Sequence, residues 1–301
     1  MRLFACAVIP LLLLAGTASA QPHPQPPAPP RPAPADADWA RYPAATEVQL
    51  RDLAAIVRVT PQARDDVALA VINAGPLPDP ELRIARNRLI VDGKQRRTIR
   101  SCRGERDEFS VELARHGRLR GEQLPVIEIR VPRDAVVSAS GAVALHVGAA
   151  QTAQITVAGC GDAEIESVRG EADITVAGSS ALRLFHAGSA RIAIAGSGDV
   201  QLGAVMEGLT ASIAGAGDLR AQRVDGPTSL AVQGAGDIVI RDGRADPLTV
   251  VIAGAGDVVH NGEAQRLDVT VLGAGDVRVR RVEGEINRRV LGGGEVIVSQ
   301  R

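Results

Sequence analysis

The sequence predicts an all-β protein whose main part is a single-stranded parallel β-helix, a solenoid of about 19 residues per coil. First, a glycine-rich phrase ending in an acidic residue recurs six times, and successive acidic positions lie 19, 19, 20, 19 and 19 residues apart. Second, short runs of alternating apolar and polar residues flank each phrase. Third, aromatic residues make up only 2% of the chain, which suits a narrow coil. A fixed period of this size indicates stacked repeats rather than separate motifs.

Residues 1–20 have the pattern of a secretory signal. Arg2 precedes an apolar run, and Ala18-Ser19-Ala20 fits the small-x-small rule, so we expect cleavage after Ala20. The apolar run is too short for a membrane span, and we expect no transmembrane span elsewhere. Residues 21–38 are rich in proline and should form a semi-rigid linker.

Residues 39–137 lack the repeat but contain β-rich runs. We expect a β-rich N-terminal cap whose later strands lead into the solenoid, because an end coil would otherwise expose strand edges and core. Asn73-Ala74-Gly75 is a turn signal, and Asp92-Gly93 predicts a hairpin between two strands. A short helix over residues 44–53 is an alternative for the start of this region.

Residues 138–301 carry the repeat, with about eight or nine coils. Each unit has an alternating strand such as Ile155-Thr156-Val157, the glycine-rich turn, a second alternating strand and a polar turn. A lone coil cannot bury its apolar face, whereas stacked coils can, with strands about 4.8 Å apart. We expect a right-handed helix, as for other parallel crossovers. A left-handed helix of hexapeptides is the competing fold.

The mature chain would contain two cysteines, Cys102 and Cys160. In an oxidising compartment such a pair can form a disulfide, which here would link the N-terminal region to the first glycine-rich phrase. Two separate buried thiols are the alternative.

These glycine-rich phrases on a 19-residue period, behind a signal sequence and a β-rich region, resemble the putative auto-transporter adhesin, head GIN domain family. The resemblance covers approximately residues 47–301. It implies a β-helix related in shape to pectate-lyase-type solenoids and a role at the bacterial cell surface. It implies no catalytic residues, because the family has none established.

The acidic residues of the six phrases should form one line along the stack. They are Asp199, Asp218, Asp237, Asp257, Asp276 and Glu295. Neighbouring carboxylates about 4.8 Å apart repel each other by roughly 1 kcal/mol in water. One hypothesis is that each carboxylate accepts hydrogen bonds from N–H groups of its own turn. The other is a row of calcium sites, which would make the melting temperature depend on calcium. We expect no other cofactor.

Outward positions of the first strands are mostly small, which predicts a flat face rather than a catalytic cleft. They are Thr156, Thr175, Ala193, Ser212, Ala231, Val251 and Thr270. An outward row on the second strands could meet an acidic partner, although a solvated face is the simpler interpretation. It comprises Arg183, Gln201, Arg220, Val239, Val259 and Arg278. Basic and acidic residues balance, 34 against 35, which disfavours nucleic-acid binding.

The sequence therefore predicts a non-enzymatic, exported β-helix, located in the periplasm, on the outer cell surface or outside the cell. We expect it to serve adhesion or interaction with an envelope or surface partner not specified by the sequence. A carbohydrate-active enzyme similar to pectate lyase is one alternative. An envelope module that assembles end to end through the C-terminal coil is another, because the last coil ends on Glu295-Val296-Ile297-Val298 with no obvious cap and leaves an exposed strand edge. Arg288 replaces an inward valine of this coil, which predicts that the coil is open or distorted.

Overall fold

A computed structural model describes residues 39–103 and 109–300. The expected signal sequence with its cleavage at Ala20, and the proline-rich linker, lie outside the described residues. Strands β1 to β24 dominate the described part, with a single-turn 3-10 helix at Gly121–Gln123. Within residues 39–103 and 109–300, no helix has the length and hydropathy to cross a membrane. The prediction of an all-β protein is confirmed.

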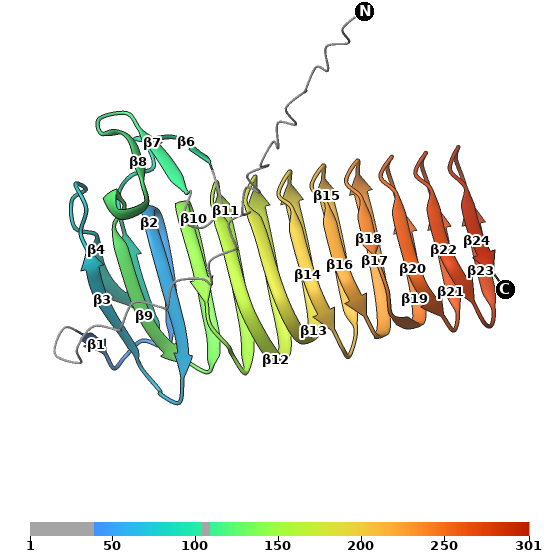
Figure 1. Cartoon of the computed structure of the whole chain (residues 1–301), viewed down its shortest axis with the longest axis horizontal. Helices are drawn as coiled ribbons and strands as arrows, with labels where there is room; N and C mark the ends of the chain where they lie inside the picture. Colours follow the sequence, from blue (N-terminus) through green and yellow to red (C-terminus); the bar gives the residue numbers. More distant parts are fainter. Residues whose placement is uncertain (1–38, 104–108, 301) are drawn as a thin grey trace, which may run out of the picture. The chain divides into compact units, whose positions relative to one another are not determined.

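From β10 onward the chain forms a parallel solenoid of about nine turns, each of about 19 residues (Figure 1). We call the surface of strands before each glycine-rich turn the first face, and the surface after it the second face. Strands of the first face are β11 (Thr152–Gly159), β15 (Leu209–Gly215), β17 (Gly226–Gly234), β19 (Arg244–Ile252), β21 (Leu267–Val271) and β23 (Ile286–Val290). Those of the second face are β14 (Val200–Val205), β16 (Leu219–Val224), β18 (Ile238–Ile240), β20 (Val258–Ala264), β22 (Val277–Val282) and β24 (Val296–Gln300). Three longer strands contribute to both faces: β10 (Asp134–Val147), β12 (Asp162–Gly178) and β13 (Ala181–Gly196).

The core is a stack of aliphatic side chains held in register. Ile155 pairs with Ile174, and Ile174 with Ile192, so equivalent residues of successive coils lie above one another. All three are at most 1% exposed. Each such side chain contributes about 1.5–3 kcal/mol by leaving water. The apolar alternation that predicted the strands therefore also produces the continuous core.

The glycines of the repeated phrase are required mainly by close stacking between coils. A Cβ built on Gly236 would lie 2.0 Å from the carbonyl oxygen of Gly217 in the preceding coil. At Gly215 the same close approach combines with a φ of 147°, a conformation that side chains with a Cβ rarely adopt. Any larger residue at these corners would push neighbouring coils apart.

The N-terminal end of the stack is not built in sequence order. Strand β2 (Glu47–Gln62) pairs in parallel with β10, for example Val57 with Leu145. On its other side β2 pairs with β5 (Arg88–Asp92) and β9 (Val126–Pro132). Strand β2 thus lies between β9 and β10, which only Arg133 separates in the chain. The stack therefore extends into the N-terminal region, with β2 as a full two-faced coil.

Antiparallel strands lie along the N-terminal edge of this stack. Strand β3 (Val67–Asn73) pairs with β9, β1 (Ala40–Tyr42) pairs with β3, and β4 (Glu81–Ala85) pairs with β5. They satisfy backbone groups that an open end would expose.

The alternative helix over residues 44–53 and the predicted hairpin at Asp92-Gly93 are both wrong. Residues 47–53 belong to strand β2 and not to a helix, because pairing on both sides outweighs a weak helical pattern. The hairpin turn lies at Arg86-Asn87, between β4 and β5, rather than at Asp92-Gly93. Arg86 adopts the required positive φ of 58°, while the Asp92 side chain accepts a bond from the Lys94 N–H and ends β5.

A small three-stranded sheet covers part of the second face. It comprises β6 (Ile99–Arg103), β7 (Ser110–Leu113) and β8 (Gly117–Arg120), all antiparallel. Phe109 and Val111 pack with Ala142 and Ala144 of β10, which explains why that stretch of β10 is apolar on both sides. A disulfide joins Cys102 of β6 to Cys160, with Cα atoms 5.9 Å apart, as predicted from the cysteine pair.

Candidate functional site

The six acidic residues of the repeat form a hydrogen-bonded ladder between coils, which we call the acidic ladder. The backbone N–H of Asp218 donates to Oδ1 of Asp199 at 3.2 Å. The same bond is made by the N–H groups of Asp237 (3.0 Å), Asp257 (2.8 Å), Asp276 (2.8 Å) and Glu295 (2.9 Å), each to the preceding carboxylate. In return, the N–H of Val200 donates to the carbonyl of Asp218 at 2.8 Å. Each of the five aspartates therefore binds its coil to the next one.

This geometry corrects the expected partner of the carboxylates. We expected each carboxylate to bind N–H groups of its own turn, but the bond goes to the following coil. The reason is that the stack places the backbone N–H of the next acidic residue directly beside the carboxylate.

Arginines of the outward row on the second face partly neutralise the ladder. Parallel pairing places that row in register as predicted, from Arg183 through Gln201 and Arg220 to Arg278. Arg220 binds Oδ2 of Asp218 at 2.9 Å, and Arg278 binds Oδ2 of Asp276 at 2.8 Å. These cations offset the repulsion between neighbouring carboxylates, so the row is tied to the ladder instead of forming a separate basic field.

The ladder does not resemble a preformed cation site. Among the residues that the structure describes, no group of three or more His, Cys, Asp and Glu side chains is placed to hold a metal ion. At Asp218 and Asp276, Oδ1 accepts a backbone N–H and Oδ2 accepts an arginine. The calcium hypothesis stays a prediction, and comparing the melting temperature with calcium and with a chelator would test it.

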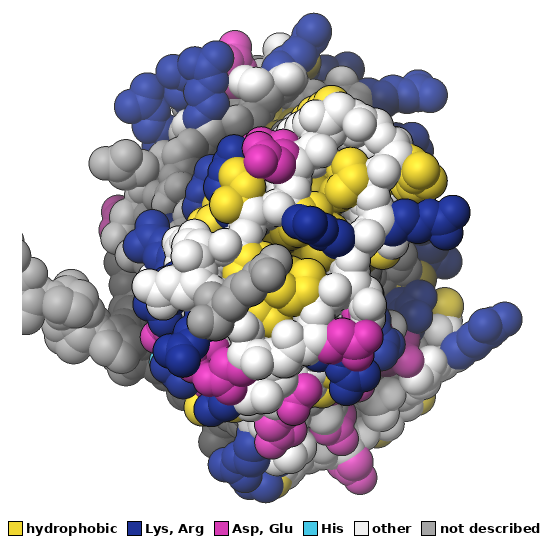
Figure 2. Space-filling model, turned by 90° about the vertical axis from the view of Figure 1, so that its right-hand side faces the viewer, with side chains coloured by type: hydrophobic (Ala, Val, Ile, Leu, Met, Phe, Trp, Pro, Cys, Tyr) yellow, Lys and Arg dark blue, Asp and Glu magenta, His cyan; other side chains and the backbone are white. Residues whose placement is uncertain are grey.

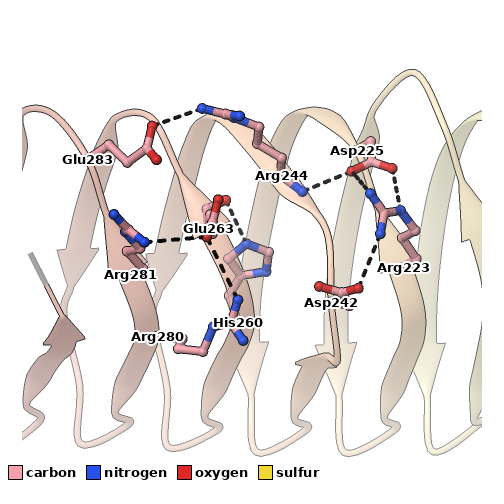
Figure 3. A network of polar contacts seen from close by, with 9 residues as sticks. All are labelled: Arg223, Asp225, Asp242, Arg244, His260, Glu263, Arg280, Arg281 and Glu283. Carbon is pink, nitrogen blue, oxygen red and sulfur yellow. Dashed lines mark hydrogen bonds and ion pairs between the residues drawn. The ribbon is translucent and has the colours of Figure 1, made fainter.

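A second set of charges connects the coils along the polar closing turns (Figure 3). Arg223 binds Asp225 of its own coil at 2.6 Å and Asp242 of the next at 3.1 Å. Arg244 donates its backbone N–H to Asp225 at 3.0 Å, and its side chain binds Glu283 at 2.8 Å, two coils further on. Partial burial raises the pKa of Asp225, but the hydrogen bonds from Arg223 and Arg244 outweigh it and hold the pKa below its ordinary value.

With this geometry established, the family can be assigned. The family model described as "Putative auto-transporter adhesin, head GIN domain" matches residues 89–223 and 210–301. The chain belongs to this family. The matched residues include the acidic ladder and both faces of the regular coils of this head GIN domain.

Two solved structures are similar to this head GIN domain. A putative adhesin from Parabacteroides distasonis is 14% identical, with a TM-score of 0.49, over 86% of this chain and 94% of that one. A putative adhesin from Bacteroides fragilis is 13% identical, with a TM-score of 0.35, over 86% of this chain and 96% of that one. No protein of curated function matches the sequence.

The first face of the head GIN domain has the small outward residues that the sequence predicts. Thr156, Thr175 and Ala193 lie in one row across neighbouring strands. Val251 is an apolar member of this row and is 39% exposed, and it is followed in register by Thr270 and then by Arg289. Leu272, which directly follows the next first-face strand β21, is 49% exposed.

One histidine of the head GIN domain is buried inside the coil stack. His260 is 0% exposed and takes the inward register position between Ile240 and Val279. Its Nε2 lies 3.3 Å from the carbonyl of Glu263, while Nδ1 has no hydrogen-bond partner within the described residues. Burial lowers the pKa of this imidazole.

The only tryptophan lies in a group of residues that we did not predict as a site from the sequence. Trp39, Arg41, Arg64, Ala68 and Arg130 line one hollow at the N-terminal edge. They are distant in sequence and have no shared motif, so only the antiparallel pairing of β1, β3 and β9 brings them together. The sole signal in the sequence was a tryptophan followed two residues later by an arginine.

Proposed function

We propose that this head GIN domain is a non-enzymatic, exported adhesion module that presents fixed side chains to a partner at the bacterial cell surface. The ladder bond, repeated at five successive coil boundaries, carries the proposal. It holds each coil to the next, so the outward rows of both faces keep their spacing. Solenoids use such extended, regular surfaces for binding. Membership of a family described as adhesins supports the same function.

Export and adhesion can be tested together in the native bacterium. A strain lacking the gene is compared with the same strain carrying the wild-type gene or a copy without residues 2–20. We expect the wild-type protein in the envelope or medium, and weaker attachment to host-derived or neighbouring-cell surfaces in its absence. Cytoplasmic retention of the wild-type protein, or unchanged attachment in the deletion strain, would contradict the proposal.

The non-enzymatic part of the proposal needs its own measurement. The purified domain is incubated with acidic polysaccharides, and released reducing ends and unsaturated products are followed over time. We expect no turnover above a heat-denatured control. Turnover that disappears on substituting Asp237 or Asp257 would instead favour the polysaccharide-cleaving alternative.

A further inference from the structure

The three-stranded sheet of β6 to β8 carries an excess of positive charge in a chain that is otherwise net negative. Residues 96–120, from the turn before β6 to the end of β8, contain eight arginines against four acidic residues. The whole chain has 34 basic against 35 acidic residues, so the overall balance conceals this asymmetry. A local excess of one sign creates a field that attracts the opposite charge.

Most arginines of this sheet are exposed and carry no ion pair. The seven that belong to the described residues are all exposed: Arg96, Arg97, Arg100, Arg103, Arg115, Arg118 and Arg120. Of these seven, only Arg118 has an acidic partner within residues 39–103 and 109–300, Glu112 at 3.4 Å. The other three acidic residues of the segment lie within 105–108, outside the described residues, and Glu122 follows the sheet in the 3-10 helix. The described part of the sheet therefore presents several guanidinium groups to solvent.

Strand alternation places these charges on the outer side of the sheet, which stands beside β10 (Figure 1). Val111 and Leu119 lie opposite each other and are buried against the stack, so their neighbours along the strands point away from it. In one outward row, Arg103 lies opposite Ser110, and Ser110 lies opposite Arg120. Directly opposed residues of an antiparallel sheet project from the same side. Two arginines thus flank a small hydroxyl residue on this outer side.

A second outward row is also polar. It contains Ser101, Glu112 and Arg118. A five-residue strand such as β6 is about 17 Å long, and three neighbouring strands cover about 10 Å. The arginines are therefore spread over an area, and they do not converge on one point.

This arrangement favours a plane of phosphate groups as the partner. Guanidinium groups bind phosphate oxygens through paired N–H donors. Phe109, the aromatic residue of this sheet, is 1% exposed, so the described outer side offers no ring on which the bases of a nucleic acid could stack. The two outward rows contain no apolar side chain, so contact would stay at the level of charged headgroups.

We propose that the outer side of the β6 to β8 sheet binds the headgroups of a membrane that contains anionic phospholipids. Such a contact goes beyond the proposed adhesion function. The sheet covers only part of the second face, so the first face of the solenoid would remain open to another partner.

Sedimentation with lipid vesicles tests this contact directly. The purified, oxidised mature protein is mixed with vesicles of phosphatidylcholine alone, or of equal parts phosphatidylcholine and phosphatidylglycerol, at low and at high salt. We expect binding to the anionic vesicles only, and less of it at high salt because salt screens the charges. Equal binding to both kinds of vesicle, or no binding to the anionic vesicles at low salt, would overturn the proposal.

Variants of the outward rows assign the binding to this sheet. Replacing Arg103, Arg118 and Arg120 together by glutamine should weaken binding to the anionic vesicles at least tenfold, since each arginine near such a surface raises the affinity roughly fivefold. Replacing the same three residues by lysine keeps the charge and should retain most of the binding. Thermal unfolding checks that both variants are folded. Wild-type binding by the glutamine variant, or an equal loss in both variants, would contradict an electrostatic contact at this sheet.

A matched control separates the sheet from the charge of the whole molecule. Replacing Arg241, Arg266 and Arg289 by glutamine removes the same charge from exposed positions of the solenoid and should leave vesicle binding unchanged. Duplex DNA and polygalacturonate, added as competitors at equal charge, should not displace the protein from the vesicles. A control variant that binds as weakly as the sheet variant, or displacement by either polymer, would overturn the assignment to a membrane surface.

Discussion

At the scale of single residues, Asp237 shows how one residue links three successive coils. Its backbone N–H donates to Asp218, and its Oδ1 accepts the N–H of Asp257. Removing the acceptor leaves that N–H without its partner, and a hydrogen bond to a charged group contributes about 1.5–3 kcal/mol.

We therefore expect Asp237→Ala to lower the free energy of unfolding by about 2 kcal/mol. Asp237→Asn should cost less, since an amide oxygen can accept the same N–H and the substitution removes repulsion between carboxylates. Chemical denaturation measures both. The control is Asp242→Ala, which loses only an exposed ion pair worth under about 1 kcal/mol. Equal losses for all three variants would contradict the role of the ladder bond.

His260 makes the stability of the stack depend on pH. Burial lowers its pKa in the folded state below the ordinary value of 6.5, so protonation favours the unfolded chain. Its contribution to stability is complete above pH 6.5 and decreases as the pH falls toward the lowered pKa of the folded state.

His260→Val should flatten this dependence, because valine matches Val279 at the same register and carries no charge. Melting temperatures of wild type and variant at pH 7.5 and pH 5 test it. We expect the wild type to lose more of its melting temperature on acidification than the variant. The exposed His186 provides the control, since His186→Gln should behave as wild type. A wild-type curve parallel to that of His260→Val would refute the effect.

At this scale the sequence predicted which residues of successive coils stack in one row, but not their hydrogen-bond partners. The 19-residue period was sufficient to place the six acids in one line and the arginines in another. The direction of each ladder bond depends on how the glycine-rich turn orients its N–H groups, which a period does not specify. The cluster around Trp39 was not predictable, because its members meet only through long-range antiparallel pairing.

At the scale of elements, the three-stranded sheet of β6 to β8 is fastened to the stack in two ways. Its apolar residues pack on Ala142 and Ala144, and the disulfide joins Cys102 to Cys160. The bond closes a loop with a sequence separation of 58 residues. For a loop of this length the entropic model gives a stabilisation of about 4 kcal/mol.

Replacing both cysteines by serine should therefore loosen this sheet before the coils. We expect amide protons of residues 110–120 to exchange faster with deuterium, while those of β15 to β21 keep their rates. Mass spectrometry of the variant and of the oxidised wild type measures this. Unchanged exchange in residues 110–120 would show that packing alone holds the sheet in place.

Elements were predictable where each coil pairs with the coil that follows it in the sequence. Strands of the repeat pair with the coil one period away, so the alternation of residues such as Ile174 and Val176 predicted both strand and partner. Before β10 this relation fails. The turn at Arg86-Asn87 lacks the usual glycine, and the weak helical pattern at residues 47–53 is overruled by pairing with β5 and β10.

At the scale of the whole molecule, the C-terminal coil combines an apolar interior with a charge. Figure 2 views this end of the stack and shows hydrophobic side chains at its centre with a basic side chain lying over them. Val269 pairs with Arg288, so the arginine takes an inward register position in the last first-face strand. Strand β23 keeps regular pairing there, and the coil is not distorted. A charge directed inward opposes the stacking of a second apolar coil, because the charge would have to leave water.

We expect Arg288→Val to increase self-association by allowing the apolar ends of two molecules to meet. Sedimentation velocity over a range of concentrations compares it with wild type. Arg289→Val removes the same charge from the neighbouring outward position and should sediment as wild type. If Arg288→Val does not associate more than Arg289→Val, the arginine has no role in keeping the ends apart.

The position of β2 between β9 and β10 has a consequence for how the length of this protein can change. In the regular part, removing 19 residues, for example 210–228, joins equivalent points of adjacent coils and shortens the stack by one turn. A similar deletion within residues 47–147 would either remove a strand that pairs with β2 or disturb the pairing of β2 with β10. Paired residues of these two strands, such as Val48 and Val137, lie about 90 positions apart in the chain. Gain and loss of coils, in evolution or by engineering, is therefore confined to the part after β10, while the first coils form a fixed unit on which any number of repeats can be built.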